Sequence, residues 1–150
     1  VVITGDHGEE FFEHGMWGHT GNFTKTEVMV PMVMRGPGVA PGVERAPSSH
    51  VDVAPTLLEI LGADPAMREK WTVGENMFSL AEKRNRVVAG WEVVGTWTPD
   101  AIVMLPLNAY RGMPDVYDYD WRPVPDPDAV LRSNGEALRE LIESTQRFMQ

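Results

Sequence analysis

Three of the four histidines of this 150-residue sequence lie near its start, among several carboxylates. A short β-branched run, Val1 to Thr4, ends at Gly5 and is followed directly by Asp6 and His7. A carboxylate and an imidazole are both good ligands for a divalent metal. Glycines on both sides of this pair allow tight turns and close backbone approach. Asp6 and His7 are therefore candidate metal ligands.

The elements around this pair are expected to deliver it to the edge of a sheet. A continuous run such as Val1 to Thr4 is typical of a strand that is covered on both faces, as in a parallel sheet. Ligands of open α/β sheets bind outside the carboxyl ends of the strands, where Asp6 and His7 would lie. The glycine-containing segment from Gly5 to Lys25 is expected to form a long functional loop, with at most one helical turn around Glu9 to Glu13.

The next segments predict a second strand and a helix. Glu27 to Arg35 reads as a buried strand, with Pro31 indicating an edge position or a start at Met32. Asp52 to Gly62 has the clearest helix signals, because Asp52 can cap the first turn and Gly62 allows a left-handed exit. Leu57, Leu58 and Leu61 would form its apolar stripe.

The C-terminal part predicts a small separate subdomain. Arg86 to Val94 and Ala101 to Leu107 are expected to form an antiparallel hairpin with a turn at Gly95 to Asp100. A short edge strand is expected near Val116 to Trp121. Asp128 to Gln150 has the apolar spacing of a terminal helix. We therefore predict an α/β fold in which residues 1–84 belong to a catalytic domain and residues 85–150 form the hairpin-and-helix subdomain.

Composition narrows the classes of protein. The formal net charge of −9, from 22 acidic and 13 basic residues, argues against a nucleic-acid partner, because phosphate binding needs clustered Lys and Arg. The absence of cysteine excludes disulfides and thiolate metal sites. The sequence has no apolar run of ~18 residues that would span a bilayer. It opens on a strand without an initiator Met, so we expect further sequence upstream.

Four blocks, in this order and at these spacings, resemble the sulfatases of the alkaline phosphatase superfamily. The blocks are Thr4 to Glu9, Glu13 to His19, Val30 to Gly38 and Val51 to Gly62. The resemblance is good to about Gly62, and beyond it only the hairpin followed by a terminal helix is similar to the family's small C-terminal subdomain. It implies the C-terminal part of an alkaline-phosphatase-like α/β sandwich.

The resemblance also implies roles for three residues. It places Asp6 and His7 as ligands of one divalent cation, and His19 where the family carries a Lys or His that contacts the transferred group. Oxygen ligands favour Ca²⁺ or Mg²⁺, whereas an imidazole shifts the preference towards Mn²⁺ or Zn²⁺. A protonated His19 would stabilise developing negative charge or protonate the departing alkoxide.

One large departure from the family pattern concerns the nucleophile. The family makes a formylglycine from a Cys or Ser within Cys/Ser-x-Pro-x-Arg, in an N-terminal half that also supplies the remaining acidic ligands. This sequence has no cysteine, and none of its serines lies in that motif. We therefore expect a C-terminal portion of a sulfate ester hydrolase that is inactive by itself.

Other carboxylates and histidines of the loop have simpler interpretations. Glu9, Glu10 and Glu13 fit a solvated face, although Glu9 could hydrogen-bond the loop or orient His7. His14 is interpreted as a structural hydrogen-bonding residue.

Two alternative functions stay open at this point. A phosphoethanolamine or phosphoglycerol transferase, or a phosphodiesterase, would use a similar Asp-His pair with a Thr or Ser nucleophile. A non-catalytic, membrane-anchored sulfatase-like domain would instead bind lipid or protein. The expected partner is a small-molecule, glycan or lipid sulfate ester, with membrane contact only through sequence upstream. The resemblance favours a periplasmic, secreted or membrane-anchored location.

Overall fold

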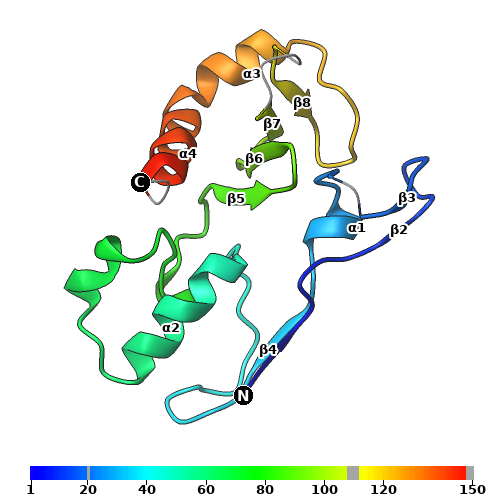
Figure 1. Ribbon diagram of the computed structural model, residues 1–150. Helices are drawn as coiled ribbons and strands as arrows, with labels where there is room; N and C mark the ends of the chain where they lie inside the picture. Colours follow the sequence, from blue (N-terminus) through cyan, green and yellow to red (C-terminus); the bar gives the residue numbers. More distant parts are fainter. Residues whose placement is uncertain (20, 108–111, 148–150) are drawn as a thin grey trace. The chain divides into compact units, whose positions relative to one another are not determined.

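The protein folds as two compact units, as seen in the computed structural model, which describes residues 1–19, 21–107 and 112–147 (Figure 1). Unit 1 comprises Val1–Thr4 and Met32–Arg84, and unit 2 comprises Gly5–Pro31 and Asn85–Gln150. Within the described ranges, no helix has the length and apolar character needed to cross a membrane.

Unit 1 combines a two-stranded antiparallel sheet with one α-helix and short 3₁₀ helices. In chain order its elements are β1 (Val2–Thr4), β4 (Met32–Met34), η1 (His50–Asp52), α2 (Val53–Ile60), η2 (Pro65–Lys70) and η3 (Met77–Ser79).

The first strand pairs differently from the prediction. β1 is antiparallel to β4, with Ile3 opposite Val33, and these side chains are 65% and 59% exposed. The expected parallel, fully covered strand is therefore not found. A parallel pair requires a crossover connection, whereas here the chain leaves β1 and returns into β4 at the same end of the pair, which gives antiparallel pairing.

The predicted helix forms as η1 and α2, but Asp52 does not cap it by its side chain. The fully buried Asp52 carboxylate instead accepts hydrogen bonds from the backbone N–H groups of Ser49 and Glu75, at 2.7 and 2.8 Å. Both terminal nitrogens of Arg84 also donate to it, at 2.7 and 3.2 Å. A buried carboxylate is tolerated when its charge is paired and its oxygens are hydrogen-bonded. Asp52 thus joins three separate segments of unit 1.

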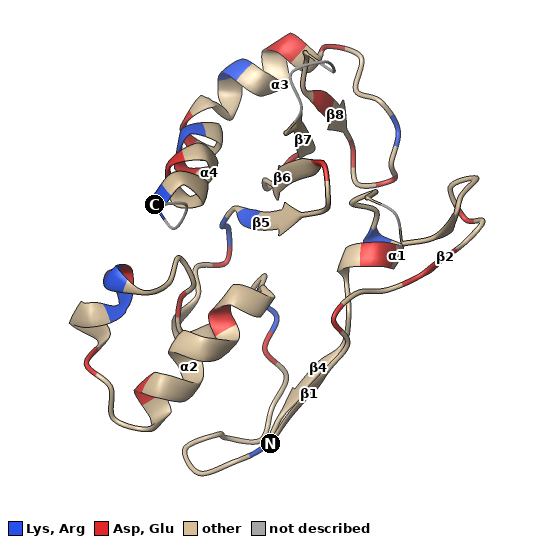
Figure 2. Ribbon diagram, viewed as in Figure 1, with Lys and Arg blue, Asp and Glu red and all other residues tan. Residues whose placement is uncertain are grey.

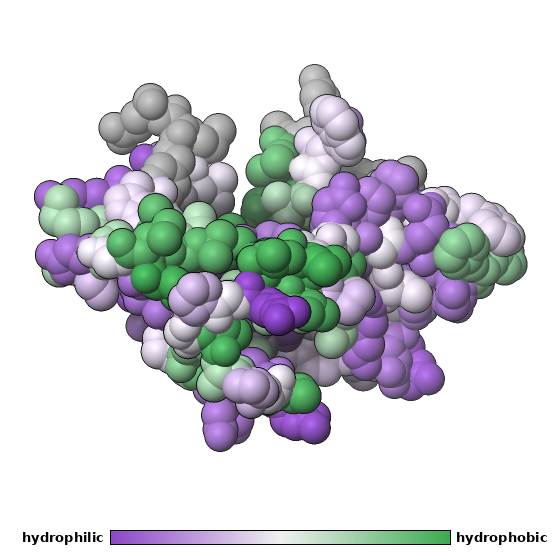
Figure 3. Space-filling view, turned by 90° about the horizontal axis from the view of Figure 1, so that it is seen from below, coloured by the Kyte–Doolittle hydropathy of each residue, from purple (hydrophilic) through white to green (hydrophobic). Residues whose placement is uncertain are grey.

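The predicted apolar stripe of α2 lies at the surface. Leu57, Leu58 and Leu61 are 37%, 40% and 81% exposed, while Pro55 and Thr56 are the buried residues of the helix. Thr56 is held inside because its hydroxyl donates to the Asp52 carbonyl and accepts from the Met77 backbone N–H. Figure 3 shows hydrophobic residues gathered on the face seen there. Sequence periodicity identified the apolar stripe but not what it contacts.

Unit 2 is built on a four-stranded antiparallel sheet in the order β5-β6-β7-β8. The sheet consists of β5 (Arg86–Ala89), β6 (Val93–Trp97), β7 (Ile102–Pro106) and β8 (Asp115–Tyr117). The remaining elements are the hairpin strands β2 (Glu10–Phe11) and β3 (Trp17–Gly18) and the helices α1 (Lys25–Val28), α3 (Pro127–Ser133) and α4 (Gly135–Arg147).

The two faces of this sheet pack against different parts of the chain. Side chains alternate along a strand, so Ile102 and Met104 of β7 point to one face and Val103 points to the other. Ile102 and Met104 form a core with Phe23 and Trp97. Val103 packs with Ala101 and Val116, and partly buried residues of α3 and α4 cover this second cluster. The segment that carries Asp6 and His7 is therefore in the same unit as the sheet.

The C-terminal sheet is larger than the predicted hairpin. Gly95 to Trp97, predicted as part of a turn, lies inside β6, and the turn that precedes it falls at Gly90 to Glu92. Gly95 marks a close approach, because a Cβ atom there would lie 2.6 Å from the Val103 carbonyl oxygen and 2.8 Å from a Phe23 ring carbon. Glycine within a strand commonly has this meaning.

The remaining C-terminal predictions are largely met within the described residues. The predicted edge strand is β8, and the predicted terminal helix is divided into α3 and α4 around Asn134. Leu141 of α4 is 2% exposed. Residues 148–150 of the predicted helix lie outside the described residues.

Gly95→Ala should destabilise unit 2, because the added methyl group overlaps Phe23 and the Val103 carbonyl oxygen. We expect a loss of about 1–3 kcal/mol in the free energy of unfolding, which is typical of overpacking. Urea titration followed by tryptophan fluorescence measures this. Gly135→Ala is the matched control, since no atom of the described residues that could obstruct a Cβ lies within 4 Å of its Cβ position. Equal unfolding midpoints for both variants would contradict the close approach.

Candidate active site

A short hairpin brings the two ends of the N-terminal loop together. β2 pairs antiparallel with β3, with Glu10 opposite Gly18 and Phe11 opposite Trp17. Continuing this register by one residue sets Glu9 opposite His19. The tip turns through Phe12 and Gly15, both with positive φ. The helical turn expected around Glu9 to Glu13 is thus replaced by a strand, and the helical turn of this segment lies at α1 instead.

The loop is fixed to the sheet and to α1 by backbone contacts. Phe23 is 2% exposed in the core of unit 2, and its carbonyl accepts a hydrogen bond of 3.1 Å from the Trp97 indole N–H. Gly8 donates its N–H to the Glu27 carbonyl at 2.7 Å. A Cβ atom on Gly8 would lie 1.8 Å from the Thr26 carbonyl oxygen. Only glycine fits there, which explains the glycine that follows the Asp-His pair.

A buried carboxylate organises the inside of the loop. Glu10 is fully buried and accepts hydrogen bonds from the hydroxyls of Thr24 and Thr26 and from His14 Nδ1, the last two both at 2.8 Å. Burial acts to raise the pKa of Glu10, but these hydrogen bonds outweigh it and lower the pKa to about 2. His14 therefore has the structural role expected of it, and Glu10 is not on a solvated face.

Asp6 and His7 lie next to each other at the surface. The Asp6 side chain is 91% exposed, and its Oδ2 lies 3.8 Å from His7 Nε2. Hydrogen bonds from backbone N–H groups, including that of His7, lower the pKa of Asp6. His7 Nδ1 donates to the Gly8 carbonyl at 2.8 Å, and this contact raises the pKa of His7. In the neutral imidazole the proton is thus on Nδ1, which leaves Nε2 as an acceptor.

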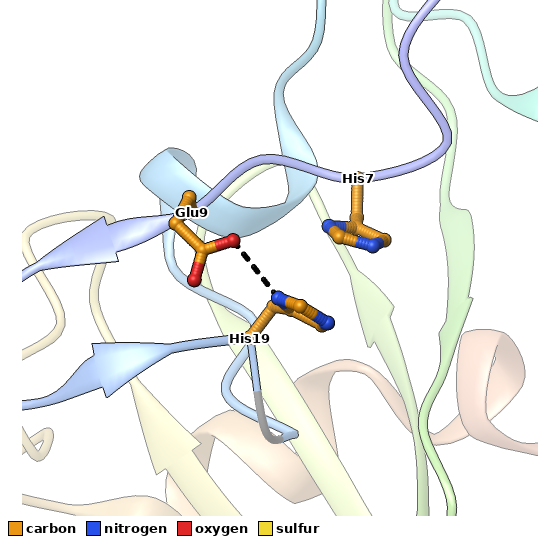
Figure 4. A group of neighbouring side chains, drawn as sticks. All are labelled: His7, Glu9 and His19. Atoms are coloured by element: carbon orange, nitrogen blue, oxygen red, sulfur yellow. Dashed lines mark hydrogen bonds and ion pairs between the residues drawn. The ribbon is translucent and has the colours of Figure 1, made fainter.

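His19 is paired with Glu9 and stacks on His7. Its Nδ1 lies 2.9 Å from Glu9 Oε2, as the dashed line in Figure 4 shows. The His7 and His19 rings are stacked with centroids 3.9 Å apart and an interplanar angle of 25°. A carboxylate at Nδ1 fixes the tautomer and orientation of an imidazole. Glu9 therefore orients His19, whereas the sequence had suggested His7 as its partner.

The surroundings of these side chains are acidic. Acidic residues occur in β2 and on α1, as the red segments in Figure 2 show. Burial and the neighbouring Glu10 carboxylate raise the pKa of Glu27, which is 6% exposed. The negative charges of Asp6 and Glu9 favour a dication close by.

The structure brings His7, Glu9 and His19 together as a potential metal-binding group, in which one donor atom from each lies within 4.8 Å of the others. Asp6 is adjacent through His7. Sequence reasoning singled out Asp6, His7 and His19 and missed Glu9 as a member. The hairpin register could have indicated it only if the turn at Phe12 to Met16 had been recognised. Thr20, which follows His19, lies outside the described residues.

Comparison with known proteins finds a family match for the first part of the chain. Residues 1–63 match the family model described as Sulfatase. This segment contains Asp6, His7, Glu9 and His19, and it ends close to Gly62, where the sequence resemblance became weak. The predicted resemblance to the sulfatase family is therefore confirmed over residues 1–63.

Individual relatives are named sulfatases. The chain is 29% identical to a choline-sulfatase of Rhizobium meliloti (strain 1021) over 102 residues, 66% of this chain and 20% of that protein. It is 37% identical to sulfatase ppz1 of Metarhizium majus (strain ARSEF 297) over 63 residues, 41% of this chain and 15% of that protein. Arylsulfatase K of Mus musculus is 39% identical over 64 residues, 41% of this chain and 11% of that protein. The chain thus spans a fifth or less of these relatives.

Glu10→Gln should make unfolding less dependent on pH below neutrality. Folding lowers the pKa of Glu10 from 4.5 to about 2, so its stabilising contribution is complete above pH 4.5 and is lost as the pH falls towards 2. At pH 7 we expect Glu10→Gln to cost about 1–3 kcal/mol, as for hydrogen bonds to charged groups.

Urea titrations from pH 3 to pH 7 measure this difference. The exposed helical Glu140 provides the control variant Glu140→Gln. A difference in unfolding free energy between wild type and Glu10→Gln that grows as the pH falls would contradict the lowered pKa of Glu10. A carboxyl group with a raised pKa, such as Glu27, would give that opposite trend.

Proposed function

We propose that this chain supplies part of the active site of a metal-dependent sulfate ester hydrolase, with Asp6 and His7 as metal ligands and His19 as a catalytic residue. The observation that carries the proposal is the separation of 3.8 Å between Asp6 Oδ2 and His7 Nε2, with His7 Nδ1 engaged by the Gly8 carbonyl. The sulfatase family match over residues 1–63 supports the reaction class.

The donor set of Asp6 and His7 fits a divalent cation. A metal-binding histidine usually donates its other ring N–H to a carbonyl or carboxylate, as His7 Nδ1 does to Gly8. Asp6 is held as a carboxylate by its lowered pKa, which is the form that metal binding requires. The raised pKa of His7 means that an ion must displace a proton from its Nε2 when the imidazole is charged. A bound Ca²⁺, Mg²⁺, Mn²⁺ or Zn²⁺ ion would neutralise a sulfate oxygen and polarise the ester for attack.

His19 is suited to proton transfer at the leaving oxygen. Glu9 accepts from His19 Nδ1, so Nε2 is the nitrogen that can hold or release a proton on the substrate side. In its imidazolium form His19 would donate its Nε2 proton to the departing alkoxide. The side chain of His19 is half exposed, which leaves it accessible to a substrate.

We further propose that the nucleophile and the other acidic ligands come from sequence outside these 150 residues. The chain has no cysteine and no serine in Ser-x-Pro-x-Arg, and it spans a fifth or less of its named relatives. Residues 1–84 would belong to the catalytic α/β domain, and residues 85–150 would form the small C-terminal subdomain. The substrate would be a small-molecule, glycan or lipid sulfate ester.

Hydrolysis by the complete protein tests the reaction class. We expect release of sulfate from choline sulfate or p-nitrophenyl sulfate that is abolished by a chelator, and no turnover by the 150-residue chain alone. Bis(p-nitrophenyl) phosphate is the comparison substrate. Faster cleavage of this phosphodiester than of both sulfate esters would favour the phosphodiesterase alternative and overturn the proposal. No turnover of any ester, with metal retained, would favour a non-catalytic domain.

Variants of the three residues test their separate roles in the complete protein. Asp6→Ala and His7→Ala should lower metal occupancy and turnover together, because each removes a ligand. His19→Ala should keep the metal and lower turnover by about 10²–10⁴-fold, the range for a lost general acid. Metal analysis by mass spectrometry and steady-state kinetics measure both quantities. Unchanged occupancy and rate in both ligand variants would rule out the metal assignment.

A further inference from the structure

We propose that His7, Glu9 and His19 form a chelating site for a borderline transition metal, with Zn²⁺ as its ligand, which is distinct from the pair formed by Asp6 and His7. One donor atom from each of the three side chains lies within 4.8 Å of the others. The set consists of two imidazoles and one carboxylate, which suits Zn²⁺, Ni²⁺ or Co²⁺ better than the hard cations Ca²⁺ and Mg²⁺.

The local geometry brings these donors close to metal-binding separation. Ligand atoms bound to one ion at about 2.0–2.2 Å lie roughly 3 Å apart. His19 Nδ1 and Glu9 Oε2 are already 2.9 Å apart as a hydrogen-bonded pair, and a Zn²⁺ ion bound to both atoms would displace the Nδ1 proton to solvent. The stacking of the His7 and His19 rings brings His7 next to this pair. The remaining approach requires only side-chain rotation, since all three side chains are 40–50% exposed.

The backbone that carries the three side chains is firmly held. The pairing of Glu10 with Gly18 sets the separation of Glu9 and His19, and the contact of Gly8 with α1 fixes the chain after His7. His7 Nδ1 is engaged by the Gly8 carbonyl, which directs Nε2 to a metal. A site on fixed backbone loses less conformational entropy when an ion binds than one on a loose loop.

The proposed zinc site and the Asp6–His7 pair both use His7, so they cannot bind two ions independently. The regulatory effect that follows rests on the proposed function. A Zn²⁺ ion held by His7, Glu9 and His19 would remove His7 from the pair with Asp6 and would occupy His19. Where the ion that Asp6 and His7 bind is Ca²⁺, Mg²⁺ or Mn²⁺, Zn²⁺ should therefore inhibit turnover by the complete protein in competition with it.

Isothermal titration of the 150-residue chain with Zn²⁺ tests the site directly, with Co²⁺ absorption as a spectroscopic readout. We expect one Zn²⁺ per chain, with an affinity at least about tenfold weaker in Glu9→Gln and in His19→Ala, as each removes a ligand. Glu13→Gln is the matched control, because Glu13 lies in the same loop and carries the same charge but its Oε2 accepts from the Phe11 N–H.

Asp6→Asn distinguishes the two sites. We expect Asp6→Asn to keep Zn²⁺ affinity within about threefold of the wild-type value and to weaken Ca²⁺ or Mn²⁺ binding. We expect Glu9→Gln to weaken Zn²⁺ binding and to leave Ca²⁺ or Mn²⁺ binding nearly unchanged. If Asp6→Asn weakens Zn²⁺ as much as Glu9→Gln does, Zn²⁺ occupies the Asp6–His7 pair and the separate site is rejected, while the proposed function stands. Unchanged Zn²⁺ affinity in Glu9→Gln also rejects it. Circular dichroism checks that each variant is folded, and Glu9→Gln, which preserves side-chain shape, decides the test if His19→Ala unfolds.

Discussion

The buried carboxylate of Glu10 is the interaction on which the N-terminal loop depends. It lies in β2, yet its hydrogen bonds reach Thr24 and Thr26 in and before α1 and His14 at the hairpin tip. A buried charge is stable only when such partners are in place, so the carboxylate selects one arrangement of three segments. Among the described residues, neither Glu10 Oε2 nor Glu27 Oε1 has a hydrogen-bond partner. The loop therefore accepts an electrostatic cost to keep this arrangement.

The candidate site formed by Asp6, His7, Glu9 and His19 combines potential metal ligands of two chemical kinds. Asp6 offers oxygen alone and is nearly fully exposed, whereas His7 and His19 offer nitrogen and stack on each other. A hard cation would be drawn towards Asp6 and a borderline one towards the imidazoles. His7 belongs to both groups, so the identity of the ion decides which neighbours it recruits. Metal availability, rather than sequence, would then set the state of His19.

Local sequence signals predicted many of the helices and strands. They failed where the structure depends on contacts between segments that are distant in the sequence. The helix at Asp52 to Gly62, the break at Gly62 and the strands of residues 86–106 follow from turn residues, apolar runs and β-branched residues near one another. The role of Asp52 could not be predicted, because its partner Arg84 is distant in the sequence. Gly95 was taken for a turn because the sequence does not reveal that Phe23 packs against it.

The candidate site was predicted only in part, again because contacts between distant residues are not visible in the sequence. Asp6, His7 and His19 stand in motifs that can be read locally, and the family match covers them. Glu9 and Glu10 are adjacent and chemically identical, and only the hairpin separates them into a surface partner of His19 and a buried anchor. Strand alternation explains this division once β2 is known, since neighbouring side chains of a strand point to opposite faces.

Unit 2 is discontinuous in sequence, and this has a consequence for the order of folding. The loop with His7 and His19 is held by Phe23, whose core partners Trp97, Ile102 and Met104 lie more than seventy residues later. Closing so long a connection is entropically costly and is repaid only when the sheet forms. During synthesis the loop would therefore emerge long before the strands that hold it. The candidate metal ligands of this loop would acquire their geometry only after the sheet has formed.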